Sequence, residues 1–174
     1  MGSELAVQGA VLRDRHVSLR TVTPADAAFV REVYASTRDG EMALVDWDDA
    51  AKQQFLDQQF RAQSEHWAIN HGGADFDLIL VDGDPIGRLY VERSDEEIHL
   101  LDIAVLAAHR DSGVGTRLVR ELMDEAERAG LPLRLHVEMF NDGARRLYDR
   151  LGFTPVAERG LYVLMEWNPA GGKS

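Results

Sequence analysis

The chain has 174 residues, no cysteine, and 30 Asp and Glu against 19 Lys and Arg, which gives a formal net charge of −11. Such an acidic chain disfavours the counterion release on which binding to nucleic acids and anionic membranes depends, so neither partner is expected. Without cysteine there can be no disulfide, thiolate metal site or cysteine nucleophile, and no metal site is predicted.

The length suits one domain, and a hydrophobic content of 45% is normal for a globular protein. No apolar run approaches the roughly 20 residues needed to cross a bilayer, and residues 1–15 lack the apolar region of a signal peptide. We therefore predict a cytoplasmic protein with an N-terminal extension over residues 1–15, a single domain over residues 16–168 and a flexible tail over residues 169–174.

The first predicted elements are a strand and two helices. Residues 16–20 alternate polar and apolar side chains, as a half-buried strand does. The Thr-Pro-Ala-Asp segment at 23–26 is a helix start, because Thr can cap, Pro fits the first helical position and Asp complements the helix dipole. This helix should end between residues 36 and 40, and a second should begin after Asp48, where apolar residues recur at helical spacing.

From residue 75 the pattern changes to strands. Residues 76–81 and 86–92 flank an Asp-Gly-Asp-Pro turn at 82–85. Residues 100–106 are mostly apolar, as in a central strand covered on both faces. The three segments predict an antiparallel meander.

The last part of the chain alternates helices with strands. A helix is predicted over residues 113–129, a strand over 133–137, a helix over 141–151 and a terminal hairpin from strands 153–156 and 161–167. The complete order, β-α-α-β-β-β-α-β-α-β-β, predicts an α/β fold, an α+β arrangement with a mixed sheet and helices on its faces.

Residues 104–116 run from a strand through a glycine-containing turn into a helix. Such a turn exposes unpaired N–H groups that suit phosphate oxygens, and Gly113 and Gly115 place no Cβ in the way. A Rossmann fingerprint would need a third glycine where Leu118 stands, and the Gly-Lys-Ser/Thr of a Walker loop is absent. Taken alone, the segment is also compatible with a plain tight turn.

A second motif spans residues 141–153. Asn141 is a good N-cap, Ala144 and Tyr148 lie on one helix face, and Gly152 is a C-terminal cap. Taken alone, this segment is equally compatible with an ordinary amphipathic helix whose tyrosine belongs to the core.

The two motifs together resemble the GNAT superfamily of acetyl-CoA-dependent N-acetyltransferases. Arg110-x-x-Gly113-x-Gly115 carries the resemblance, with the Asn141 to Phe153 motif about 26 residues later. The resemblance covers residues 16–167, although residues 16–75 are uninformative because the family varies there with substrate. It implies a splayed central sheet, acetyl-CoA as cofactor with coenzyme A as product, and direct transfer to a primary amine of a small molecule or peptide. A homodimer is an open expectation, since superfamily members are often dimers.

The resemblance also implies which residues bind the cofactor. Pantetheine would lie along the strand backbone near Ala104 like an added strand, and the pyrophosphate would sit on the turn amides. Asn141 would bind the pantetheine arm or an ordered water. Asp111 replaces the usual small or basic residue and should weaken binding unless it points to solvent. The full set is Ile103, Ala104, Val105, Arg110, Asp111, Ser112, Gly113, Val114, Gly115, Thr116, Asn141 and Ala144.

Four residues are candidates for catalysis. Tyr148 matches the general acid of the family, because a phenol is protonated at neutral pH and can protonate the departing thiolate. His136, five residues before Asn141, is the expected general base, with a structural histidine as the alternative. Glu138 shares its strand face, and Asp102 lies on the neighbouring strand; for both, a solvated or orienting role is the alternative to catalysis.

The acceptor is not identified by the sequence. Trp47, Trp67, His66 and His71 lie in the variable helical region that would wall the acceptor pocket, with core packing as the alternative role. The excess of carboxylates weakly favours a cationic acceptor. The alternative function is a non-catalytic acyl-CoA-binding or regulatory module of the same fold; a nucleotide-phosphate module is disfavoured by the missing lysine and third glycine.

Overall fold

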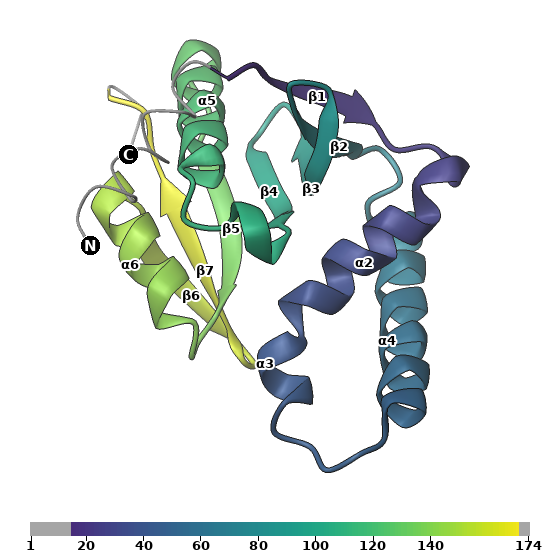
Figure 1. The fold of residues 1–174 in the computed structure, drawn as a ribbon. Helices are drawn as coiled ribbons and strands as arrows, with labels where there is room; N and C mark the ends of the chain where they lie inside the picture. Colours follow the sequence, from purple (N-terminus) through teal and green to yellow (C-terminus); the bar gives the residue numbers. More distant parts are fainter. Residues whose placement is uncertain (1–14, 171–174) are drawn as a thin grey trace, which may run out of the picture.

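Seven strands form one mixed sheet in the computed structural model, which describes residues 15–170 (Figure 1). The strands are β1 (Val17–Thr21), β2 (Asp75–Val81), β3 (Asp84–Arg93), β4 (Ile98–Val105), β5 (Leu133–Glu138), β6 (Thr154–Arg159) and β7 (Tyr162–Trp167). They lie in the order β1-β2-β3-β4-β5-β7-β6, and every neighbouring pair is antiparallel except β4 with β5. The predicted mixed sheet and the meander within it are confirmed.

The helices cover the two faces of this sheet. They are α2 (Ala27–Thr37), α3 (Asp39–Met42), α4 (Asp49–Asn70), α5 (Val114–Ala129) and α6 (Asp142–Leu151), with the 3-10 turns η1 (Pro24–Asp26) and η2 (Ala107–His109). Alternate residues of β2 separate the faces, because Ile79 packs in the cluster with α5 and α6, whereas Leu78 packs with α2 and α4. The predicted element order is therefore confirmed, with α3 and the two 3-10 turns added.

The turn between β2 and β3 is tighter than expected. Asp82 and Gly83 form its two central residues, with φ of 52° and 88°, and β3 already begins at Asp84. A two-residue turn with positive φ at both positions matches the twist of a hairpin. Pro85 therefore lies inside a strand, next to a register shift in the pairing of β2 with β3.

The central feature of the sheet is the separation of β4 from β5. Their parallel pairing covers three residue pairs, from Ile98 with Leu133 to Leu100 with Leu135. At that point β4 bulges, because Val91 pairs with Leu100 while Tyr90 pairs with Asp102, which leaves Leu101 as the extra residue. Beyond the bulge, β4 follows β3 and β5 follows β7. The expected splay is confirmed.

The ends of the described chain and its helices complete the fold. The extension expected over residues 1–15 lies outside the described residues except for Arg15, as do residues 171–174 of the expected tail. Pro169 is buried, and the Ala170 amide donates to Oε2 of Glu127 over 3.1 Å. Within residues 15–170, no helix is both long and apolar enough to cross a membrane.

Candidate active site

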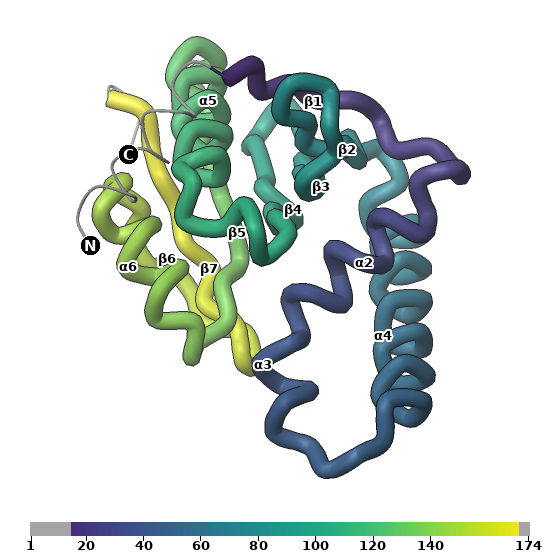
Figure 2. The backbone as a smooth tube through the Cα atoms, in the orientation of Figure 1, coloured from purple at the N-terminus to yellow at the C-terminus, as the bar shows by residue number. Residues whose placement is uncertain are grey.

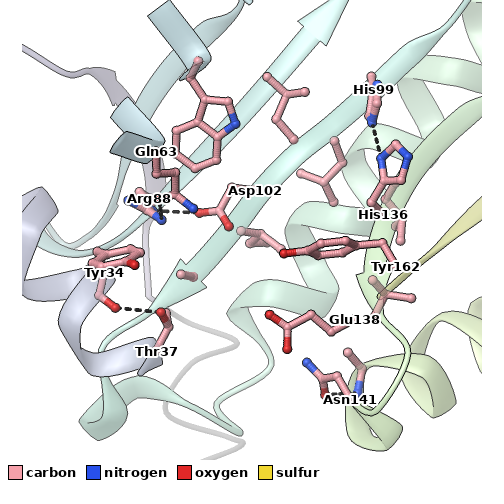
Figure 3. A pocket seen from close by; sticks show the side chains of 18 of the residues that line it. Tyr34, Thr37, Gln63, Arg88, His99, Asp102, His136, Glu138, Asn141 and Tyr162 are labelled. Atoms are coloured by element: carbon pink, nitrogen blue, oxygen red, sulfur yellow. Dashed lines mark hydrogen bonds and ion pairs between the residues drawn. The ribbon is translucent and has the colours of Figure 1, made fainter. Parts of the chain in front are cut away.

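A cavity of about 890 Å³ occupies the opening between β4 and β5 (Figure 3). Figure 2 shows α2, α3 and α4 on one side of this opening and the hairpin of β6 and β7 on the other. The residues from the sequence prediction that line the cavity are Asp102, Ile103, Ala104, His136, Glu138, Asn141, Ala144 and Tyr148. The structure thus brings all four catalytic candidates, from three different elements, to one cavity.

Tyr148 is held on α6 with its ring in the core and its side chain at the cavity. Only 8% of the residue is exposed, and its ring packs against Phe153 with centroids 5.5 Å apart. Burial and, to a smaller extent, the negative charge of Asp102 raise the pKa of Tyr148 to about 12. The phenol is therefore neutral at physiological pH and retains a proton to donate.

His136 and Glu138 share the open face of β5, while Leu135 and Val137 are buried on the other face. Nδ1 of His136 lies 3.2 Å from Nε2 of His99 on β4, so the two imidazoles are hydrogen-bonded where the pairing of β4 with β5 ends. Burial is the main cause that lowers the pKa of each histidine. A neutral imidazole pair therefore faces the cavity and can accept a proton.

Asp102 lies just beyond the bulge and is paired with an arginine that the sequence prediction missed. Nε of Arg88 on β3 donates to Oδ2 of Asp102 over 2.7 Å. Arg88 is 1% exposed, whereas the side chain of Asp102 is 25% exposed and reaches the cavity. Burial raises the pKa of Asp102, and the adjacent guanidinium opposes that rise.

The turn before α5 lies outside the cavity lining and presents free backbone amides. The first intrahelical bond of this end runs from Arg117 N–H to the Gly113 carbonyl over 3.0 Å. Within residues 15–170, the amides of residues 113–116 find no acceptor, as expected at a helix start. Gly113 adopts φ of 87°, and Asp111, with φ of 58°, is exposed to solvent. These features match an anion-binding turn.

Arg110, also in the predicted cofactor set, uses its side chain elsewhere. Its guanidinium donates to the Ser36 carbonyl over 2.9 Å and to the Val105 carbonyl over 3.3 Å. It therefore ties the end of α2 to the end of β4, and the Arg110 backbone remains as the group that can contact a cofactor. Val105, like residues 110–116, does not line the cavity.

Asn141 caps α6 as predicted. Its Oδ1 accepts a hydrogen bond from the Ala144 amide over 3.1 Å. Its side-chain amino group remains a donor at the cavity, close to Glu138 in Figure 3.

The helical region contributes the remaining wall. His66, Trp67 and His71 line the cavity, whereas Trp47 packs edge-on against Phe55 away from it. The lining residues that sequence reasoning did not single out are Tyr34, Thr37, Arg38, Glu41, Gln63, Arg88, His99, Leu100, Leu101, Leu135, Val137, Arg159 and Tyr162. Arg88 and His99 could have been singled out from the sequence, because each is a charged or imidazole side chain within a largely apolar strand, β3 or β4. Across residues 15–170, no group of three or more His, Asp or Glu is arranged to hold a metal ion.

Comparison with known proteins gives a consistent result. The chain matches the acetyltransferase (GNAT) family over residues 40–153. It is 36% identical over 90 residues to mycothiol acetyltransferase of Nocardiopsis dassonvillei, a match covering 51% of this chain and 23% of that protein. The match thus spans about a quarter of that relative's length.

Solved structures share the fold at low sequence identity. PaiA N-acetyltransferase from Thermoplasma acidophilum, determined in complex with coenzyme A, gives a TM-score of 0.66 at 16% identity, over 88% of this chain and 99% of that chain. YncA from Salmonella typhimurium, determined with acetyl-CoA, gives a TM-score of 0.55 at 23% identity, over 91% of this chain and 96% of that chain.

Proposed function

Because the chain belongs to the acetyltransferase (GNAT) family, we propose that it is an N-acetyltransferase that moves an acetyl group from acetyl-CoA directly to a primary amine of a small molecule or peptide. The observation that carries this proposal is the meeting of Tyr148, the imidazole pair and Asp102 in the opening between β4 and β5. A neutral acid, a neutral base and a carboxylate suit acyl transfer to an amine.

Two backbone surfaces of this chain fit acetyl-CoA. Among residues 15–170, no strand pairs with residues 101–105 of β4 on the side of the opening, so this edge can pair with the amides of pantetheine. The amides of residues 113–116 can bind the pyrophosphate at the start of α5. When bound, acetyl-CoA supplies an acetyl thioester that is activated for attack by an amine.

The imidazole pair can prepare the amine. An aliphatic amine arrives as an ammonium ion and must lose a proton before it attacks. With Nδ1 of His136 donating to Nε2 of His99, Nε2 of His136 is left as an acceptor for that proton. Glu138, on the same face of β5, lies beside this path.

Tyr148 can complete the exchange of bonds. As the amine nitrogen bonds to the acetyl carbon and the carbon–sulfur bond breaks, the Tyr148 hydroxyl donates its proton to the leaving sulfur. Of the two protons that the nitrogen loses, one restores the phenol and the other leaves to solvent. Charge and atoms balance without a covalent intermediate on the protein, which has no cysteine to form one.

An acceptor path to Tyr148 supports an enzyme over a non-catalytic acyl-CoA-binding module. Tyr34 and Thr37 of α2 and Trp67 of α4 line the same cavity as Tyr148, so an amine entering between the helices and the hairpin can reach it.

The proposal is tested by thiol release from acetyl-CoA over a panel of primary amines: ethanolamine, tyramine, spermidine and a lysine-containing peptide. The protein contributes no thiol background. We expect coenzyme A binding by calorimetry and amine-dependent thiol release with at least one acceptor. Binding of coenzyme A with no release for any amine would favour the non-catalytic module, and no binding at millimolar ligand would refute both.

A further inference from the structure

In the Asp102–Arg88 pair, only one of the two Asp102 carboxylate oxygens is bonded to the arginine, and this points to a ligand for the other. We propose that the free carboxylate oxygen of Asp102 binds the ammonium group of the acceptor, and that the buried Arg88 is the positioning residue that holds this carboxylate ready. The inference rests on the proposed function and assigns the part of the site that recognises the acceptor.

The two oxygens of Asp102 have different surroundings. Oδ2 accepts from Nε of Arg88 over 2.7 Å, whereas Oδ1 has no hydrogen-bond partner among residues 15–170. The side chain is one quarter exposed, and it opens to the cavity (Figure 3). The bulge at Leu101 sits immediately before it, at the point where the parallel pairing ends. The fold therefore aims one unpaired carboxylate oxygen into the opening.

Arg88 lies at the wall of the cavity, but its side chain is almost fully enclosed by neighbouring side chains. Its guanidinium carbon lies 5.1 Å from the ring centre of Tyr90, 5.3 Å from that of Trp67 and 5.9 Å from that of Tyr34. Nη2 donates to Gln63 over 3.3 Å, and Nη1 is buried without a hydrogen-bond partner in the described chain. Three aromatic faces fix the cation, and Asp102 is its partner in the described ion pairs.

Stability alone is a poor explanation for this arrangement. A buried ion pair loses hydration, and apolar residues of similar volume often serve stability as well or better. Here the arginine leaves one nitrogen unpaired, which adds to the cost. Burial raises the pKa of Asp102, and the guanidinium opposes that rise, so the arrangement favours the charged carboxylate relative to the same carboxyl group without Arg88.

The location of Asp102 suits an amine about to react. Asp102 and Tyr148 line the same cavity, so an ammonium on Oδ1 would share that space with the proposed general acid. His136 and Glu138 of β5 line the same cavity and can take the proton. Arg88 binds the other carboxylate oxygen, Oδ2, so it does not compete with an amine for Oδ1.

The decisive variant is Asp102→Asn, which keeps the shape and an acceptor for Arg88 but removes the charge. The probe is the amine of the panel above with the highest kcat/KM in the unmodified protein. We expect its KM to rise about tenfold to a hundredfold, the scale of a charge-assisted hydrogen bond, while the KM for acetyl-CoA stays within about twofold. The matched control is Asp77→Asn, a partly buried aspartate of β2 outside the cavity, which should leave both constants unchanged.

Arg88→Met tests the positioning role. It should raise the acceptor KM as Asp102→Asn does, and the double variant should be no worse than either single one, because the same contact is lost. If Arg88→Met does not fold, Arg88→Lys is expected to retain most of the acceptor affinity. An unchanged acceptor KM in Asp102→Asn, or equal losses for acceptor and acetyl-CoA, would overturn the inference. If the unmodified protein acetylates no amine, the proposed function itself fails, which is a distinguishable result.

Discussion

Replacing Tyr148 by phenylalanine isolates a single hydroxyl group. The ring is 8% exposed and packs on Phe153, and phenylalanine preserves both its volume and this contact. Within residues 15–170, the Tyr148 hydroxyl makes no hydrogen bond and is not a buried unpaired atom, so removing it leaves no protein group unpaired and should not lower the melting temperature. Loss of a general acid typically costs about 10² to 10⁴ in rate. We therefore expect kcat to fall by that factor while coenzyme A affinity stays within about threefold.

The raised pKa of Tyr148 sharpens this prediction. A pKa of about 12 leaves only about 1% of the phenol ionised at pH 10, where an ordinary tyrosine is half ionised. Steady-state rates followed by thiol release should therefore show no alkaline fall up to about pH 10. Because the unfolded state ionises first, the stability contributed by this burial is complete below pH 10 and is lost between about pH 10 and 12. An unchanged kcat in Tyr148→Phe, or an alkaline fall centred well below pH 10 that this variant abolishes, would refute the assigned role.

Two further predictions concern the base and the cofactor. His136→Gln should lower kcat/KM by about 10² to 10³ and remove the acid limb of the pH profile, which in the unmodified protein lies below about pH 6.5 because burial lowers the pKa of His136; an acid limb that survives the change would assign the base elsewhere. Gly115→Ala should weaken coenzyme A binding about tenfold or more by calorimetry, because its Cβ would occupy the space beside the turn amides. The same variant should melt no lower, since that Cβ would meet Ile103 at an ordinary 3.9 Å and alanine favours the helix; an equal loss of stability and binding would contradict this explanation.

The parts of the site that the sequence predicts are those set by local chemistry. Asn141 caps α6 by accepting from the Ala144 amide, and glycines form the turn before α5. Both features depend on residues close together in the chain, so the two sequence motifs predict them. Tyr148 follows from its position on the same helix as the cap. The family resemblance then supplied roles that no spacing alone could give.

The parts that were missed depend on register between strands far apart in the chain. Arg88 meets Asp102 on one face of the sheet because β3 and β4 shift register at Leu101. A single extra residue in an apolar strand cannot be recognised from the sequence pattern. His99 meets His136 because the parallel register sets His99 opposite Arg134, so His136, two residues further along β5, lies diagonally beside it on the same face. Both contacts therefore depend on strand register, which is a tertiary feature.

The net charge of −11 and an anionic cofactor are reconciled by where the positive groups lie. At the start of α5 the available groups are backbone amides, and the nearby guanidinium of Arg110 is occupied by the carbonyls of Val105 and Ser36. Phosphate binding by amides and a helix dipole requires no excess of basic side chains. In the proposed mechanism the acidic side chains remain available for the acceptor, and Asp102 in the opening is held by the buried Arg88. Under the proposed function, an acidic protein would thus separate two opposite charges, with the anion bound by its backbone and the cationic acceptor bound by a carboxylate.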